Sequence, residues 1–324
     1  MMELKPELIE RIRKLDEKYE AMGQSLVSYL DGLLYADYLT YWDYIHLDTL
    51  LSLQTPKTSI PDEQVFIMYH QITELHFKLA LHELRQLSEN HKLTADDMLK
   101  SLGRINRYMN ALIDSFDIMV EGMDPAQFHK FRMSLLPASG FQSGQYRMIE
   151  IYCTEFINLV LSDHRSGFTG YPTDTMIEQM YNFIYWKTGA TELSTGKKTL
   201  TLKQFELKYS NELIELAKKC RMDNLWSRFK SLTENDQKNS QLIDALKMLD
   251  LNVNVNWPLS HYKSAVRYLQ KDPEDIAATG GTNWQKYLPP RFQKRIFYPS
   301  LWNAEEIENW GKNWVRSVVF GEKK

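Results

Sequence analysis

Apolar residues recur at helical spacing along nearly the whole chain, and this periodicity limits the fold more than any other feature of the sequence. In the first segment, Leu8, Ile12, Leu15, Tyr19 and Met22 lie three or four residues apart, as on one face of an amphipathic helix. Similar patterns run over residues 63–89, 94–121, 141–161, 173–187, 201–219, 236–249, 258–270 and 303–317. Short breaks that contain Pro or Gly separate them, and no convincing β-hairpin or βαβ pattern intervenes. The sequence therefore predicts an all-α fold, a large helical bundle.

The length of the chain and its 43% of hydrophobic residues allow one large core or two modest ones, and we expect a single domain over residues 1–324. The most loop-like stretch is KTGATELSTGKKTL, residues 187–200, which predicts a surface position. We expect residues 171–225, which include it, to form a surface helical excursion from the main bundle.

The charge balance argues against two classes of partner. Lys and Arg number 39 against 42 Asp and Glu, the formal net charge is −3, and no long block of like charge occurs. We therefore do not expect the chain to bind nucleic acid or an anionic membrane. The expected partners are small molecules or further copies of the chain. The opening segment lacks the apolar run of a signal peptide, and no eighteen-residue apolar stretch occurs, so we expect a cytoplasmic protein.

The two cysteines, Cys153 and Cys220, are far apart and stand outside any CxxC or CxxCH motif. This arrangement excludes a disulfide scaffold, a thiolate zinc site and covalent haem attachment. The paired Glu-x-x-His motifs of di-iron bundles are absent, as are the P-loop, G-x-G-x-x-G and H-E-x-x-H patterns. Any metal would have to be held by histidine or carboxylate.

Histidines concentrate between residues 62 and 84, where His70, His76 and His82 are six residues apart. Each step of six turns a helix by about 240°, so the three imidazoles point to different sides and cannot converge on one metal. Only His70 lies on the apolar stripe, where it faces either a core or an apolar pocket. His261, just after Pro258, shares a helix face with Tyr268. For a lone histidine of this kind a structural role is commoner than ligation, and spacing alone does not choose between them.

A second group of candidates surrounds the PASGFQS stretch. Pro137 is expected to end one helix, and Ser139 with Gln142 matches a capping box that would start the next. Arg132, between aromatic residues and Leu135, is either paired structurally or a clamp for a substrate carboxylate. Tyr41 and Tyr44 are either packing residues or the lining of an aromatic pocket. The ATGGTNW stretch at 278–284 is either a simple turn or a loop that binds a carboxylate or an ammonium group.

Four stretches together resemble the tryptophan 2,3-dioxygenase family: YWDYIHLDTLLSLQ, DEQVFIMYHQITELHFKLALHEL, FRMSLLPASGFQSGQYRMIE and the later TGGT…YL. The similar region runs from about residue 38 to 302, and PASGFQS is its most specific part. The resemblance implies a helical bundle of this haem-dependent type. It also implies a ferrous haem b that is not covalently bound, O2 as co-substrate, and insertion of both oxygen atoms across the indole C2=C3 bond of L-tryptophan. The product would be N-formyl-L-kynurenine, in the first step of tryptophan catabolism by the kynurenine pathway.

The resemblance also implies roles for single residues. His261 would be the axial ligand of the haem iron, and His70 would be the catalytic residue near the indole N–H. Arg132 would hold the substrate carboxylate. The other expected substrate-binding residues are Tyr41, Tyr44, Phe66, Phe128, Ser139 and Thr279. Family members are helical homotetramers that exchange N-terminal segments, so residues 1–40 would contact a neighbouring subunit, which would also supply Tyr41 and Tyr44.

Two departures from the family pattern lie near the amino-acid end of the expected pocket. His76 stands where family members have tryptophan, and ATGGTNW replaces GTGGSSG after a span from Arg267 to Thr279 that is several residues longer. They bear on substrate identity more than on haem binding. Two alternatives therefore stay open: a related haem-dependent monooxygenase acting on a substituted indole or another aromatic amino acid, and a helical oligomer that binds haem or tryptophan without turnover.

Overall fold

The computed structural model describes residues 5–37, 39–188, 190–191, 196–268 and 294–311, and within these ranges the regular structure is helical. The only β-type pairings among them are isolated bridges, Val160 with Ile184 and Thr191 with Lys198. The predicted all-α fold is confirmed. No helix in these ranges is both long enough and apolar enough to cross a membrane.

The chain divides after Thr55 into two units. The first contains α1 (Pro6–Ala21), α2 (Leu26–Leu34), α3 (Tyr41–Tyr44) and α4 (Leu47–Leu51). Of its described residues only Leu26 is buried, while Leu33, Leu34 and Tyr35 of α2 and its C-terminal cap are among the most exposed apolar side chains of the chain. A single domain over residues 1–324 stays a prediction.

The second unit contains both long and short helices. They are α5 (Asp62–Glu89), α6 (Ala95–Ser115), α7 (Asp117–Val120), α8 (Pro125–Phe131), α9 (Gly144–Cys153), α10 (Ser162–Arg165), α11 (Asp174–Asn182), α12 (Tyr185–Thr188), α13 (Leu200–Lys219), α14 (Leu225–Lys230), α15 (Glu234–Gln237), α16 (Ser240–Leu251), α17 (Trp257–Tyr268) and α19 (Ala304–Glu308). Short 3₁₀ turns are η1 (Arg132–Leu135), η2 (Gly140–Gln142), η3 (Phe156–Leu159) and η6 (Pro299–Leu301), and η4 (Asn252–Asn256) is a π-helical turn.

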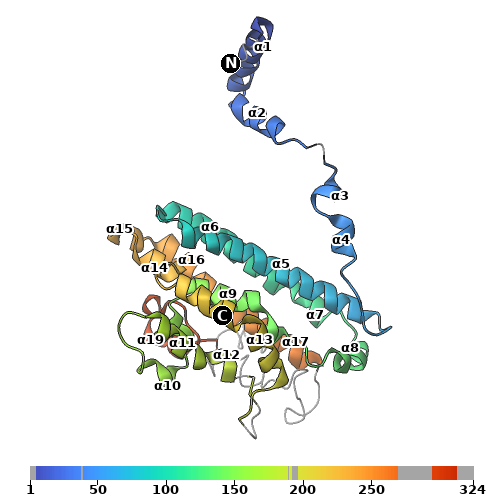
Figure 1. Cartoon of the computed structure of the whole chain (residues 1–324), viewed down its shortest axis with the longest axis vertical. Helices are drawn as coiled ribbons and strands as arrows, with labels where there is room; N and C mark the ends of the chain where they lie inside the picture. The colour runs from blue at the N-terminus through green and yellow to red at the C-terminus, as the bar shows by residue number, and fades with distance from the viewer. Residues whose placement is uncertain (1–4, 38, 189, 192–195, 269–293, 312–324) are drawn as a thin grey trace. The chain divides into compact units, whose positions relative to one another are not determined.

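Helices α5 and α6 lie side by side, and α9 and α16 pack against them (Figure 1). Their facing sides form the main core, in which Leu81, Leu102, Ile105, Ile149 and Leu246 are almost fully buried. Helix α13 packs on α9 from the other side. The core therefore lies between elements from both halves of the unit.

Side-chain caps set several helix starts. Thr94 and Asp97 form a capping box before α6, and Glu63 accepts hydrogen bonds from the backbone N–H groups of Lys57 and Thr58 ahead of the first turn of α5. These bonds satisfy amides that a helix start or tight turn leaves without a partner. Patterns 63–89 and 201–219 correspond closely to α5 and α13.

Several expected helices are shorter than the periodicity suggested. The pattern at 173–187 divides into α11 and α12, and the pattern at 236–249 divides into α15 and α16. The pattern at 141–161 contains α9, which ends at Cys153, and then a separate 3₁₀ turn, because Thr154 adopts an extended backbone. The pattern at 94–121 divides near Phe116 into α6 and α7. The expected helix at 303–317 is also shorter: α19 ends at Glu308 and a turn follows, in which Gly311 has a φ of 76°. Residues 312–317 lie outside the described residues.

The segment expected to be a surface excursion contributes to the main core. Trp186 and Phe205 are almost fully buried, and Leu213 and Ala217 of α13 join the same cluster. In the loop between α12 and α13, Ala190 is buried as well, and its carbonyl oxygen accepts hydrogen bonds from the N–H and hydroxyl of Thr199. The apolar side of α13 needs a partner, and α9 provides it.

A charged network is enclosed in this second unit. Glu150 of α9 is fully buried, with one carboxylate oxygen 3.0 Å from Nη1 of Arg147 and the other 2.8 Å from Nη1 of Arg295. The Tyr185 hydroxyl bonds to the same groups. Burial raises the pKa of Tyr185 well above its usual value, so the network holds two cations against one carboxylate.

Candidate functional site

His70 lies in the middle of α5, on the side that faces aromatic residues. Its ring contacts that of Phe66 at 4.1 Å between centroids and that of Tyr69 at 6.0 Å. Its Nδ1 is 2.7 Å from the carbonyl oxygen of Phe66, and a carbonyl only accepts, so Nδ1 carries the proton. Burial lowers the pKa of His70, so the ring is uncharged at neutral pH and its Nε2 is an acceptor.

Aromatic rings from three helices meet beside His70. Phe66 of α5 lies 6.2 Å from Phe128 and 5.8 Å from Phe131, both of α8, and Phe128 lies 4.7 Å from Tyr268 of α17. Apolar packing of this kind excludes water and accepts flat ring systems. The helix that carries His261 is thereby joined to the helix that carries His70.

His261 lies on α17, with its ring 5.7 Å from that of Phe116. Within the described part of the chain, its buried Nδ1 has no hydrogen-bond partner. Its Nε2 would be 3.6 Å from a methyl group placed on Gly140, so this nitrogen faces the PASGFQS stretch. Burial, followed by the influence of His70, lowers the pKa of His261 to about 4. The imidazole is therefore uncharged at neutral pH, as a metal-binding histidine must be.

The PASGFQS stretch contains the predicted capping box. The N–H of Phe141 donates to Oγ of Ser139 at 3.3 Å, and the N–H of Ser139 donates to Oε1 of Gln142 at 3.2 Å. This cap starts only the 3₁₀ turn η2. The long helix that follows, α9, has its own cap, where Oγ of Ser143 accepts from the N–H of Tyr146.

Helix α13 holds this stretch in place from the side. The Thr201 hydroxyl donates to the carbonyl oxygen of Pro137 at 3.0 Å, and Nε2 of Gln142 donates to the Thr201 carbonyl oxygen at 3.3 Å. Arg132 follows Phe131 directly and is partly buried in η1. The break after Arg132 is thus a loop fixed by hydrogen bonds to α13, and its Gly140 faces Nε2 of His261.

The structure brings together several of the predicted site residues within the second unit. Ring contacts link Phe66, His70 and Phe128, and His70 influences the pKa of His261. Tyr41 and Tyr44 lie on α3 of the first unit, where they are 70% and 75% exposed. Thr279 lies outside the described residues, and the substrate roles of all these residues stay predictions.

Sequence reasoning missed four aromatic residues that form the walls of this site, although local signals for them existed. Trp257, His261 and Tyr268 are spaced by four and seven residues, which places them on one face of α17. Trp257 contacts Phe116 at 5.0 Å, and Phe131 directly precedes Arg132 at the start of the stretch FRMSLLPASGFQSGQYRMIE.

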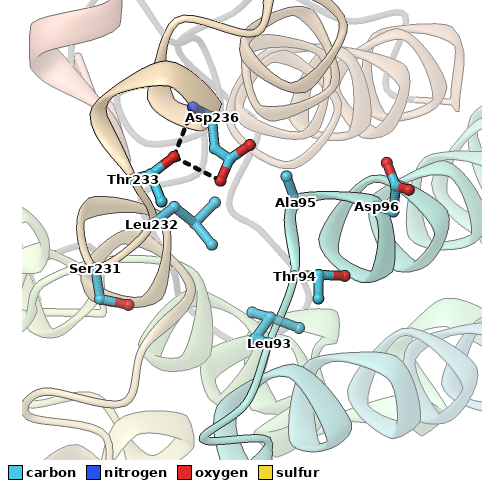
Figure 2. A pocket seen from close by; sticks show the side chains of 8 residues that line it. All are labelled: Leu93, Thr94, Ala95, Asp96, Ser231, Leu232, Thr233 and Asp236. Atoms are coloured by element: carbon cyan, nitrogen blue, oxygen red, sulfur yellow. Dashed lines mark hydrogen bonds between the residues drawn. The ribbon is translucent and has the colours of Figure 1, made fainter.

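A surface hollow among the described residues lies away from these side chains. It measures about 410 Å³ and separates the start of α6 from the α14–α15 turn, and its lining residues are Leu93, Thr94, Ala95, Asp96, Ser231, Leu232, Thr233 and Asp236 (Figure 2). Figure 2 shows the hydroxyl of Thr233 bonded to Asp236 of its own turn, as is usual for a cap. None of the predicted site residues lines this hollow.

The donor set indicates the kind of site. No three His, Cys, Asp or Glu side chains of the described ranges gather closely enough to hold a metal ion. The site instead offers the neutral imidazole of His261, a second neutral imidazole at His70, and aromatic walls. In an all-α fold, two uncharged imidazoles beside aromatic rings fit the class of helical proteins that bind a planar cofactor.

Comparisons with known proteins identify the family of the chain. Residues 32–170 match the family model described as Tryptophan 2,3-dioxygenase. The chain is 30% identical to the tryptophan 2,3-dioxygenase of Herpetosiphon aurantiacus over 273 residues, 82% of this chain and 96% of the relative. It is 29% identical to that of Bacillus thuringiensis subsp. konkukian over 273 residues, 82% of this chain and 91% of the relative. Identity to the Ruegeria enzyme of the same name is 46% over 118 residues, 36% of this chain and 42% of that relative. The chain belongs to the tryptophan 2,3-dioxygenase family.

Proposed function

We propose that this chain is a haem-dependent dioxygenase that inserts O2 across the indole C2=C3 bond of L-tryptophan and forms N-formyl-L-kynurenine, the first step of the kynurenine pathway. Family membership and the names of its relatives support the reaction and the substrate. The observation that carries the proposal to this chain is the pair of uncharged imidazoles, His70 and His261, on helices joined by aromatic rings.

The residues present fit haem b. His261 would bind the iron through Nε2, because this nitrogen faces the site while Nδ1 is buried. An uncharged imidazole is the state that ligates iron, and its low pKa keeps it in that state at neutral pH. When bound, ferrous haem would supply the iron chemistry that activates O2.

The chain's own residues would bind and orient the substrate. Phe66 and Phe128 would contact the indole ring, and Nε2 of His70 would accept a hydrogen bond from the indole N–H. Arg132 would hold the carboxylate with its planar guanidinium, and Ser139 and Thr279 would contact the amino-acid end. Their contribution is proximity and orientation of the reacting bond.

The active form would be a homotetramer in the cytoplasm. The single chain leaves Tyr41 and Tyr44 exposed, as well as most apolar side chains of α2, and exposed apolar surface of this kind marks protein–protein contacts. We propose that Tyr41 and Tyr44 contribute to the site of a neighbouring subunit and that residues 1–40 contact it.

The proposal is tested by a single turnover. Purified protein supplied with haem is reduced without oxygen and then mixed with ¹⁸O2 and L-tryptophan, and the product is identified by mass. We expect N-formyl-L-kynurenine carrying two labelled atoms. A product with one labelled atom would show a monooxygenase. A Soret band that responds to CO and to L-tryptophan without any product would show a binding protein, and either result would overturn the proposal.

A further inference from the structure

The helix that carries His261 begins with an unusual turn. Helices α16 and α17 are continuous through η4, where the N–H of Trp257 donates to the carbonyl oxygen of Asn252 five residues earlier. Such π-turns are rare and hold one residue more than an α-helical turn. Pro258 explains why the helix widens here, since it has no N–H and its ring would clash with the carbonyl group of Asn254 in a regular α-helix.

The extra residue determines the direction of His261. A regular α-helix through η4 would rotate every later residue by one helical step, about 100°. His261 would then turn away from the side on which its ring meets Phe116 and its Nε2 faces Gly140. The direction of the His261 side chain therefore depends on the rotation of α17 relative to α16.

A ladder of side-chain amides, with Asn252 and Asn106 buried at its centre, holds both ends of this turn. The side-chain Nδ2 of Asn252 lies 2.9 Å from Oδ1 of Asn110 and 3.2 Å from Oδ1 of Asn106, both on α6. Its Oδ1 accepts from Nδ2 of Asn256 at 2.9 Å, at the other end of the turn. Nδ2 of Asn106 in turn donates to the carbonyl oxygen of Ala245 on α16. Helix α6 is thereby bonded to α16 and to both ends of η4.

Two hydroxyl groups complete this bonding. The carbonyl oxygen of Val253 accepts from the Tyr146 hydroxyl of α9 at 2.7 Å, and that of Asn256 accepts from the Ser260 hydroxyl at 3.0 Å. A widened turn leaves backbone carbonyl groups poorly paired, so side-chain donors such as these hydroxyl groups stabilise it. Asn252 itself is fully buried, in a place where an apolar residue would pack without needing any partner.

We propose that Asn252 is a positioning residue for His261: its amide ladder holds the π-turn, and the π-turn sets the rotation of α17 that aims Nε2 at the haem iron. This inference rests on the proposed axial role of His261. Asn252 would contact neither the substrate nor the cofactor. It would act only by fixing the rotation of α17, and with it the direction of His261.

The test compares two buried asparagines. Asn252→Ala removes the ladder, and Asn224→Ala removes a similarly buried amide that bonds to Cys220 and Ser227 near α14, away from the site. For each variant the haem affinity, the Fe(II)–histidine stretching band in the resonance Raman spectrum and the midpoint of thermal unfolding are measured. Both variants should unfold at lower temperature. Only Asn252→Ala should shift or lose the Raman band and weaken haem binding, by about 10- to 100-fold, the range usual for residues that orient a metal ligand.

A milder variant guards against loss of folding. Asn110 is exposed on α6, and Asn110→Ala removes only one acceptor of the ladder, so it should shift the Raman band in the same direction by less. A wild-type band and wild-type haem affinity in a folded Asn252→Ala or Asn110→Ala variant would overturn the inference. If the wild-type protein instead shows no band that depends on His261, the proposed function itself fails, which is a separate result.

Discussion

The imidazole of His70 lies on the ring of Phe66, with centroids 4.1 Å apart, and its Nδ1 donates to the carbonyl oxygen of the same residue. The backbone of α5 thus selects the tautomer, and Nε2 is left as the acceptor. Because burial lowers the pKa of this ring, it neither carries a charge nor supplies a proton near pH 7. His70 is suited to orient a donor group rather than to act as a general acid.

We therefore expect His70→Ala to retain measurable turnover. Loss of one orienting hydrogen bond should lower kcat by about 10- to 100-fold, less than the loss of a true general acid or base can cost. His82→Ala is the matched control, because His82 lies on the same helix but its side chain is exposed. Steady-state kinetics with normal haem content measure both. Complete inactivity of the His70 variant would show a chemical role instead.

Replacing the proposed axial ligand should remove the cofactor. His261→Ala removes the proposed ligand of the iron, so protein produced with ample haem should lose its Soret band. His82→Ala, on the exposed side of α5, should keep it. Haem content per chain, determined by the pyridine haemochrome method, measures the difference. Equal pigment in both variants would place the ligand elsewhere.

Arg132→Leu should weaken tryptophan binding and leave haem bound. Removing the partner of a substrate carboxylate in a partly desolvated site costs about 2–5 kcal/mol. Lys130→Leu removes an exposed cation two residues away and should leave the affinity unchanged. Titration of the haem spectrum with L-tryptophan gives both dissociation constants. An unchanged constant for the Arg132 variant would mean that the carboxylate binds at another residue.

The buried carboxyl group of Asp250 should make stability depend on pH. Burial raises its pKa from 3.8 to about 6, although donors from Phe297, Tyr298, Asn254 and Trp302 oppose this shift. The folded state therefore holds the proton more tightly than the unfolded state. The resulting stabilisation is full below pH 4 and lost as the pH rises through 6, a change of about 3 kcal/mol.

Asp250→Asn isolates this effect, because the difference in free energy of unfolding between wild type and variant cancels every other titrating group. Urea unfolding from pH 4 to pH 7 should show the wild type losing stability relative to the variant over this window. A difference that stays constant with pH would show that the hydrogen bonds hold the pKa near its usual value.

The enclosed charge network predicts a large loss of stability. Glu150→Gln would leave Arg147 and Arg295 buried without their carboxylate, at a cost of about 3–5 kcal/mol. Glu89→Gln breaks an exposed pair with Lys219 and should leave the midpoint of urea unfolding unchanged. Equal midpoints for the two variants would mean that water or a rearranged side chain compensates the buried arginines.

Some features of the fold and the site followed from short-range patterns. Helical periodicity predicted α5 and α13 almost to their ends, and the Ser139–Gln142 capping box is present. The same reasoning carried the helix at 141–161 too far, because periodicity continues across Thr154 although the backbone there is extended. Periodicity reports which side chains are apolar, and a turn can keep an apolar residue buried as well as a helix can.

By itself, the sequence determined the helical class, the separation of His70 from His76 and His82, and the resemblance that singles out His261. Only the tertiary structure decided that α5, α8 and α17 meet through Phe66, Phe128 and Tyr268, and that a π-turn sets the phase of His261. The physical reason is range. Periodicity and capping act between residues a few positions apart, whereas the direction of an imidazole depends on packing and hydrogen bonds between helices that are distant in the chain.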